Sequence, residues 1–105
     1  MIAHLVLLQP KPELTDTQRA EAIDTMRRSA ADIPEIRRFS LGRRVKHGLP
    51  GYEQRMPQDF EFALIVEVDD VDALKRYLQA PAHDALAHLF YTATSAALAY
   101  DYAFE

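Results

Sequence analysis

The chain has 105 residues, of which 49% are hydrophobic and 27% charged, and its formal net charge is −4. This length fits one small domain spanning residues 1–105, and the composition is ordinary for a globular protein. The absence of cysteine excludes disulfides and thiolate metal sites and fits a reducing cytoplasm, where we expect the protein to be. The negative charge disfavours nucleic acid as a partner. No apolar run approaches the roughly 20 residues needed to cross a bilayer, so no membrane association is expected.

Residues 2–8 predict a first strand, because the run is almost wholly apolar. The period of two places His4 on one face together with Ile2, Val6 and Leu8. A histidine on an apolar face is either hydrogen-bonded at a sheet end or part of a functional site. Both interpretations of His4 stay open at this point.

A long amphipathic helix is predicted to begin after Thr15 and to end near Asp32. Thr15 and Gln18 have the spacing of a capping box, and Pro34 cannot continue the helix. Met26 is expected in the core, although a methionine can also line a pocket. The apolar positions recur at helical spacing: Ala20, Ile23, Met26 and Ala30.

Residues 36–45 predict a second, more polar strand. Gly42 inside it indicates a bulge or a close backbone approach. Its many basic side chains suit a solvated strand better than a nucleic-acid patch, because no recognition motif accompanies them. Residues 47–59 contain Gly and Pro and predict a long loop of the kind that covers a site or contacts a partner.

Two further strands are predicted over residues 60–68 and 96–105. The first alternates so that one face is wholly apolar: Phe60, Phe62, Leu64, Val66 and Val68. The second carries large side chains at alternate positions, which we expect to pack on the core or on a partner. These positions are Ala96, Leu98, Tyr100, Tyr102 and Phe104.

Two helices are predicted between those strands. Asp69 or Asp70 is suited to cap the first of them, and Pro81 breaks it before a further helix over residues 82–93. Tyr77 is expected beside the buried stripe of the first helix. That stripe is predicted at helical spacing: Val71, Leu74 and Leu78.

The element order β-α-β-β-α-(α)-β predicts an α+β, ferredoxin-like fold with a four-stranded antiparallel sheet. The helices would cover one face of the sheet and leave the other bare. A second copy is the simplest cover for that face, which predicts a homodimer through the sheet faces, that is, a dimeric α/β barrel.

The stretch from Tyr77 to Asp84 is the candidate for chemistry, because it combines a tyrosine, a proline break and His83. Histidine exchanges protons near neutral pH, and a tyrosine hydroxyl can donate to a carbonyl or enolate oxygen. Such a pair fits proton abstraction next to a carbonyl. Binding without turnover stays open, as does a structural role in which His83 caps the following helix and Tyr77 is core.

No metal or cofactor is expected. His83 and His88 are five residues apart, whereas four would place two ligands on one helical face. The chain also has no glycine-rich phosphate loop and no dinucleotide-binding fingerprint.

Six segments, in this order and spacing, resemble the stress-responsive dimeric α/β-barrel (Dabb) domain family over nearly the whole chain. They are IAHLVLL (2–8), IP (33–34), LGRRV (41–45), IVEV (65–68), YLQAPAH (77–83) and YDY (100–102). The resemblance implies a homodimer with the fold described above.

The family includes polyketide cyclases of the olivetolic acid cyclase type, and the resemblance implies site residues. In those cyclases a histidine after Pro-Ala acts as general acid or base, a tyrosine six residues earlier assists it, and a first-strand histidine lies at the site. These positions correspond to His83, Tyr77 and His4. A further tyrosine and histidine of the cyclases correspond here to Met26 and Leu64, which would make the ligand-binding pocket more apolar.

Two hypotheses follow, and whether the protein is an enzyme stays open between them. The first is a homodimeric stress-response A/B barrel protein that binds a small ligand, apolar, aromatic or polyketide-like, without turnover. The second is a cofactor-independent polyketide cyclase, lyase or isomerase. In the second, His83 is the general acid or base and Tyr77 the oxyanion donor.

Overall fold

The computed structural model describes residues 1–105 and contains one four-stranded antiparallel sheet with three α-helices. The strands are β1 (Ile2–Pro10), β2 (Arg38–Arg43), β3 (Phe62–Val68) and β4 (Thr94–Ala103), in the spatial order β2-β3-β1-β4. The helices are α1 (Asp16–Ala31), α2 (Val71–Gln79) and α3 (Pro81–Thr92), and a single 3₁₀ turn, η1, spans Glu53–Arg55. This arrangement confirms the predicted ferredoxin-like α+β fold.

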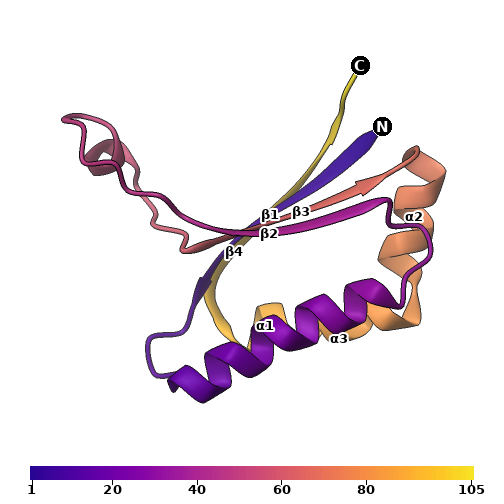
Figure 1. Cartoon of the computed structure of the whole chain (residues 1–105), viewed down its shortest axis with the longest axis horizontal. Helices are drawn as coiled ribbons and strands as arrows, with labels where there is room; N and C mark the ends of the chain where they lie inside the picture. Colours follow the sequence, from indigo (N-terminus) through magenta and orange to yellow (C-terminus); the bar gives the residue numbers. More distant parts are fainter.

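All three helices lie on one side of the sheet, and the opposite side is bare (Figure 1). The core therefore sits between the helices and the inner face of the sheet. It draws alternate residues from the two central strands, such as Val6 from β1 and Val66 from β3, which are fully buried. Met26 of α1 and Leu86 of α3 pack against them. None of the helices is both long and apolar enough to cross a membrane.

The predicted helix starts are confirmed by their hydrogen bonds. The Thr15 hydroxyl accepts from the backbone amide of Gln18 at 3.1 Å, and the Gln18 side chain accepts from the Thr15 amide at 2.9 Å. This is the reciprocal pair of a capping box. Asp70, rather than Asp69, caps α2 by accepting from the amide of Ala73 at 2.8 Å. Pro81 occupies the first turn of α3, where its missing N–H costs nothing.

Three local predictions are wrong. Val71 and Leu78 are exposed, because α2 turns a neighbouring face with Ala73, Leu74 and Tyr77 toward the sheet. Both faces have helical spacing, so only tertiary packing selects between them. In α1, the predicted core position Ala20 is likewise exposed.

Gly42 makes neither a bulge nor a close backbone approach. The β2–β3 register runs unbroken through the pair of Gly42 with Ala63, and no heavy atom lies within 4 Å of the position where a Cβ would stand. The two outer strands also differ at their ends from the predicted ranges, since β2 covers 38–43 and β4 covers 94–103.

The large side chains of β4 do not pack on the core of their own chain. Tyr100 pairs with Leu5 and Tyr102 with Ala3 on the face of the sheet away from the helices. Both tyrosines are about half exposed. The predicted alternation is therefore present, packing of this face on the chain's own core is wrong, and packing on a partner stays a prediction.

The capping box is expected to contribute measurably to stability. Thr15→Ala removes the acceptor for the Gln18 amide, and we expect the free energy of unfolding to fall by about 1 kcal/mol. Urea denaturation monitored by circular dichroism measures it. Thr17→Ala is the matched control, because Thr17 is exposed in the same first turn without a capping bond. Equal midpoints for the two variants would contradict the expectation.

Candidate functional site

Four polar side chains from four different elements meet between the sheet and the helices. His4 lies on β1, Tyr77 on α2, His83 in the first turn of α3 and Asp101 on β4. The structure thus brings together the three residues that the sequence singled out and adds a carboxylate. His4 and Asp101 face each other because they are direct partners in the β1–β4 register.

The His4 imidazole is buried, and its Nδ1 lies 2.6 Å from Oδ1 of Asp101. An ionised carboxylate can only accept a hydrogen bond, so Nδ1 carries the proton and donates. Nε2 is then the ring nitrogen that does not face Asp101. A carboxylate in this position fixes both the tautomer and the orientation of a histidine.

The Tyr77 ring lies between the two histidines. Its centroid is 5.4 Å from that of His4 and 5.0 Å from that of His83, and both contacts are edge-on. Tyr77 is the most deeply buried of the four, with 1% of its surface exposed. Burial, followed by the charge of Asp101, raises the pKa of the Tyr77 hydroxyl to about 12. At neutral pH this hydroxyl is therefore a hydrogen-bond donor and not a base.

His83 is half-buried, and burial lowers the pKa of its imidazole below the ordinary value. His4 acts in the same direction, whereas Asp84 opposes the shift. The ring is consequently neutral at pH 7 and able to accept a proton. The alternative that His83 caps α3 is wrong, because Ala80 is the N-cap residue and no side chain caps that helix.

A hollow of about 320 Å³ lies between α3 and β4, and none of the four side chains lines it. Its lining includes Val6 and Ala99, which are register partners two residues along from His4 and Asp101 on the same face. Two residues along a strand correspond to about 6.7 Å. Alanines of β4 and the aromatic residues Phe90 and Tyr91 of α3 contribute to the lining of the hollow.

The two predicted ligand-binding residues, Met26 and Leu64, lie in the core and are almost completely buried. Met26 borders a cavity of only about 20 Å³ between α1 and the sheet. Neither residue lines the hollow between α3 and β4. Their role in binding a ligand stays a prediction.

The sequence analysis missed Asp101 as a site residue. One signal was available, since Asp101 is the only polar residue among the alanines at positions 97, 99 and 103 on its face of the last strand. The pairing with His4 depends on the β1–β4 register, which brings together residues 97 positions apart in the chain. No local pattern specifies that register.

No three histidine or carboxylate side chains converge as ligands for a metal ion. The four polar groups provide instead a buried histidine held by a carboxylate, a neutral phenol and the imidazole of His83, which is neutral at pH 7. Such a set can bind an oxygen atom of a ligand and can exchange a proton with it.

The fold and this cluster define the class: a ferredoxin-like α+β domain with a titratable site under its helices. The chain matches the model of the stress responsive A/B barrel domain (Dabb) over residues 2–104, and it belongs to that family.

A curated relative and several solved structures are similar to this chain. An uncharacterized protein of Streptomyces coelicolor is 33% identical over 87 residues, covering 81% of each chain. The hydroxynitrile lyase of Passiflora edulis has a TM-score of 0.84 at 16% identity, over 99% of this chain and 93% of that one. A dimeric ferredoxin-like protein of unknown function from Thermobifida fusca has a TM-score of 0.74 at 24% identity, over 98% and 90%. At these identities the two structures show a shared fold alone.

The raised pKa of Tyr77 predicts a late step in an alkaline titration. The neutral phenol is favoured in the folded state, so its contribution to stability is complete below pH 10 and is lost as the pH rises toward 12. In an ultraviolet titration of tyrosinate, one group should ionise last, near pH 12. Tyr77→Phe should abolish that step, and Tyr91→Phe, at an exposed position, should leave it in place. A late step that survives in Tyr77→Phe would contradict the assignment.

Proposed function

We propose that the protein is a homodimeric A/B barrel protein that binds a small apolar or aromatic molecule in the hollow between α3 and β4. The observation that carries this proposal is the position of the hollow, whose lining residues Val6 and Ala99 lie two positions along their strands from His4 and Asp101. Its volume of about 320 Å³ is at the lower end of the range for small-molecule pockets, roughly 300–1,000 Å³.

The lining of the hollow favours an aromatic ligand with one oxygen substituent. Its lining includes alanines of β4 and the aromatic residues Phe90 and Tyr91 of α3. Apolar pockets with a few convergent polar groups orient ligands through those groups. A hydroxyl or carbonyl oxygen at the inner end would point toward His4, Tyr77 and His83.

The bare outer face of the sheet supports the homodimer. It exposes large apolar side chains such as Tyr100 and Tyr102 to solvent, and exposed patches of this kind mark interaction surfaces. The similar structure from Thermobifida fusca is described as dimeric. A domain of this size also gains from burying more surface, because it buries only about 60–65% of its unfolded area alone.

A second candidate function is a cofactor-independent lyase, cyclase or isomerase. It is favoured by the lowered pKa of His83 and the raised pKa of Tyr77, which make a neutral base and a neutral donor side by side. His83 would take the proton from a carbon next to a carbonyl. The electron pair of that C–H bond would form an enolate, whose oxygen would accept a hydrogen bond from Tyr77. The hydroxynitrile lyase of Passiflora edulis shows that this fold accommodates lyase activity.

Filling the hollow should abolish binding. With 1-naphthol as probe, titrated by its fluorescence, we expect Ala99→Phe to raise the dissociation constant about tenfold or more, because the added ring occupies the ligand volume. Ala103→Phe is the matched control on the same face of β4, outside the hollow. Equal binding by both variants, or none by the unmodified protein at millimolar probe, would contradict this site.

Turnover is tested separately, with β-keto thioester cyclisation as the assay. If the second function holds, His83→Ala should lower kcat by about 10²–10⁴-fold, the usual contribution of a general base. His88→Ala, at an exposed position of the same helix, should leave kcat unchanged. Because the pKa of His83 is lowered, the rate should decline with falling pH only below about 6.5. Equal rates for the two alanine variants would refute a catalytic His83.

A further inference from the structure

A hollow of about 370 Å³ lies where the loop between β2 and β3 meets the sheet, and we call it the outer hollow. Its lining includes Gly42, Ala63 and Leu7, which are paired side by side across β2, β3 and β1. Leu7 and Ala63 alternate with core residues of their strands, so the outer hollow is on the face away from the helices. A Cβ added at Gly42 would meet no heavy atom within 4 Å. Met56 and Phe60 of the loop contribute large apolar side chains to the lining.

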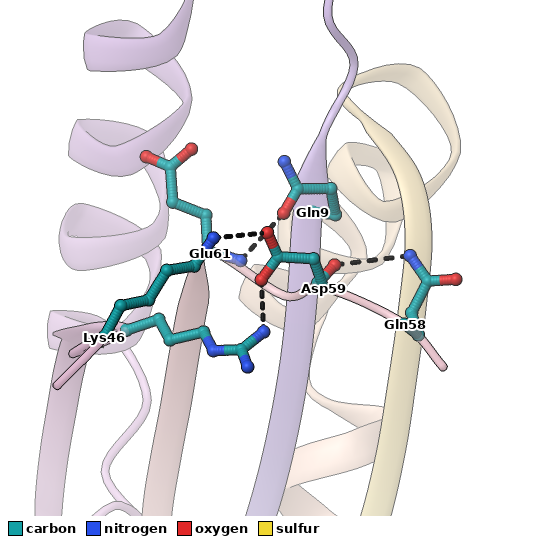
Figure 2. A network of polar contacts seen from close by, with 6 residues as sticks. Gln9, Lys46, Gln58, Asp59 and Glu61 are labelled. Atoms are coloured by element: carbon teal, nitrogen blue, oxygen red, sulfur yellow. Dashed lines mark hydrogen bonds and ion pairs between the residues drawn. The ribbon is translucent and has the colours of Figure 1, made fainter. Parts of the chain in front are cut away.

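A polar network at the base of the loop holds the loop side of the outer hollow in place (Figure 2). The Asp59 carboxylate accepts from Lys46 Nζ at 2.9 Å, and the side chain of Gln58 donates to the carbonyl of Asp59 at 3.2 Å. Gln9 of β1 accepts from the Glu61 amide at 2.8 Å, which ties the returning end of the loop to a central strand. The outer hollow is therefore complete within one chain.

One guanidinium is available to this largely apolar space. Arg43 and Arg44 both line it, but the Arg43 guanidinium lies 5.2 Å from the ring centroid of Phe62, a core residue of the other face. The Arg44 guanidinium pairs with Asp59, which also pairs with Lys46, so two cations share one carboxylate. A guanidinium has five N–H donors in a fixed fork, and Asp59 is the one hydrogen-bond partner of the Arg44 side chain within the protein. Donors of Arg44 are therefore left for a second carboxylate.

We propose that the outer hollow is a ligand site for a small carboxylic acid with a flat apolar body. The carboxylate of the ligand pairs with the Arg44 guanidinium, and the apolar body lies over Gly42 and Ala63. Charge-assisted, forked hydrogen bonds fix the orientation of such a ligand, and the apolar lining supplies most of the contact area. The volume of about 370 Å³ is within the range of small-molecule pockets, roughly 300–1,000 Å³.

This site is separate from the hollow between α3 and β4. The two share no lining residue, and they differ in charge. The lining of the outer hollow includes two arginines and no acidic residue, whereas the lining of the hollow between α3 and β4 has no charged residue at all. The outer hollow therefore suits an acid and the other hollow a neutral molecule. The proposal thus goes beyond the function proposed above.

A matched pair of ligands tests the role of the charge. 2-Naphthoate and 2-naphthamide have the same rings, and both can be titrated by their fluorescence. We expect 2-naphthoate to bind about tenfold more tightly, because only the acid forms a charge-assisted pair with Arg44. Arg44→Gln should remove that difference, whereas Arg27→Gln, at an exposed position of α1, should preserve it. Equal affinities of the two ligands for the unmodified protein, or a difference that survives in Arg44→Gln, would overturn the proposal.

Filling the outer hollow tests the location of the site. Gly42→Phe has free space for its Cβ, and its ring would occupy the ligand volume. We expect this variant to raise the dissociation constant of 2-naphthoate about tenfold or more. Ala99→Phe fills the hollow between α3 and β4 instead and should leave that constant unchanged. The opposite pattern would assign 2-naphthoate to the other hollow and refute the outer site.

A second measurement locates the ligand in the unmodified protein, because Gly42 also lies on the face proposed for the homodimer. In an isotope-labelled sample, 2-naphthoate should shift the backbone amide resonances of Gly42 and Ala63 and leave those of Ala97 and Ala99 in place. Shifts confined to Ala97 and Ala99, or no binding at millimolar 2-naphthoate, would overturn the proposal. Loss of 1-naphthol binding in Ala99→Phe with 2-naphthoate binding intact would show two independent sites.

Discussion

The register between β1 and β4 is the constraint on which both faces of this molecule depend. Side chains alternate along a strand, so a slip of one residue would exchange the two faces of β4 completely. In the observed register, Asp101 points toward the helices opposite His4, and Tyr100 and Tyr102 point away from them. The slipped register would bury aromatic rings where the hollow is and would leave the buried histidine without its carboxylate.

In the polar cluster, the cost of burying polar groups is opposed by the hydrogen bond between His4 and Asp101. Burying a polar group without a hydrogen-bond partner costs about 1–3 kcal/mol. Asp101 offsets that cost for His4, because its Oδ1 accepts a hydrogen bond from Nδ1 of the imidazole. Asp101 is itself 39% exposed in its side chain, so its charge keeps part of its hydration. Tyr77 is buried by contrast, and its hydroxyl stays neutral for that reason. The site thus combines a partly hydrated carboxylate with a buried histidine, a neutral phenol and the imidazole of His83, whose pKa is lowered by burial.

Much of the fold could be predicted from the sequence because it depends on short-range patterns. The alternation in β3 and the Thr15–Gln18 capping box each lie within a few residues, and both are present as predicted. The fold class followed from the order of such elements. The grouping of His4, Tyr77 and His83 came from a family resemblance, and the structure places their rings in contact.

The remaining features depend on contacts between distant segments, which local patterns do not contain. The buried face of α2 is one of two with equal helical spacing, and only the sheet beneath it selects Tyr77 over Leu78. A bulge was predicted at Gly42 because a glycine inside a strand often marks a bulge or a close approach of another backbone. Here it leaves free volume on the outer face instead, a property that appears only when neighbouring strands and the loop are in place.

The candidate site and the proposed interface lie on opposite faces of the same edge strand, β4. β4 is paired on one side only, with β1, and an edge strand keeps a row of unpaired backbone groups that leaves it less constrained than a central one. Asp101 lies between Tyr100 and Tyr102 on this strand, so whatever holds the two tyrosines also limits the motion of the carboxylate. Cover on the outer face therefore stabilises the geometry of the inner one. That gives a physical reason for a domain with a site under its helices to depend on a second copy packed against the opposite side of its sheet.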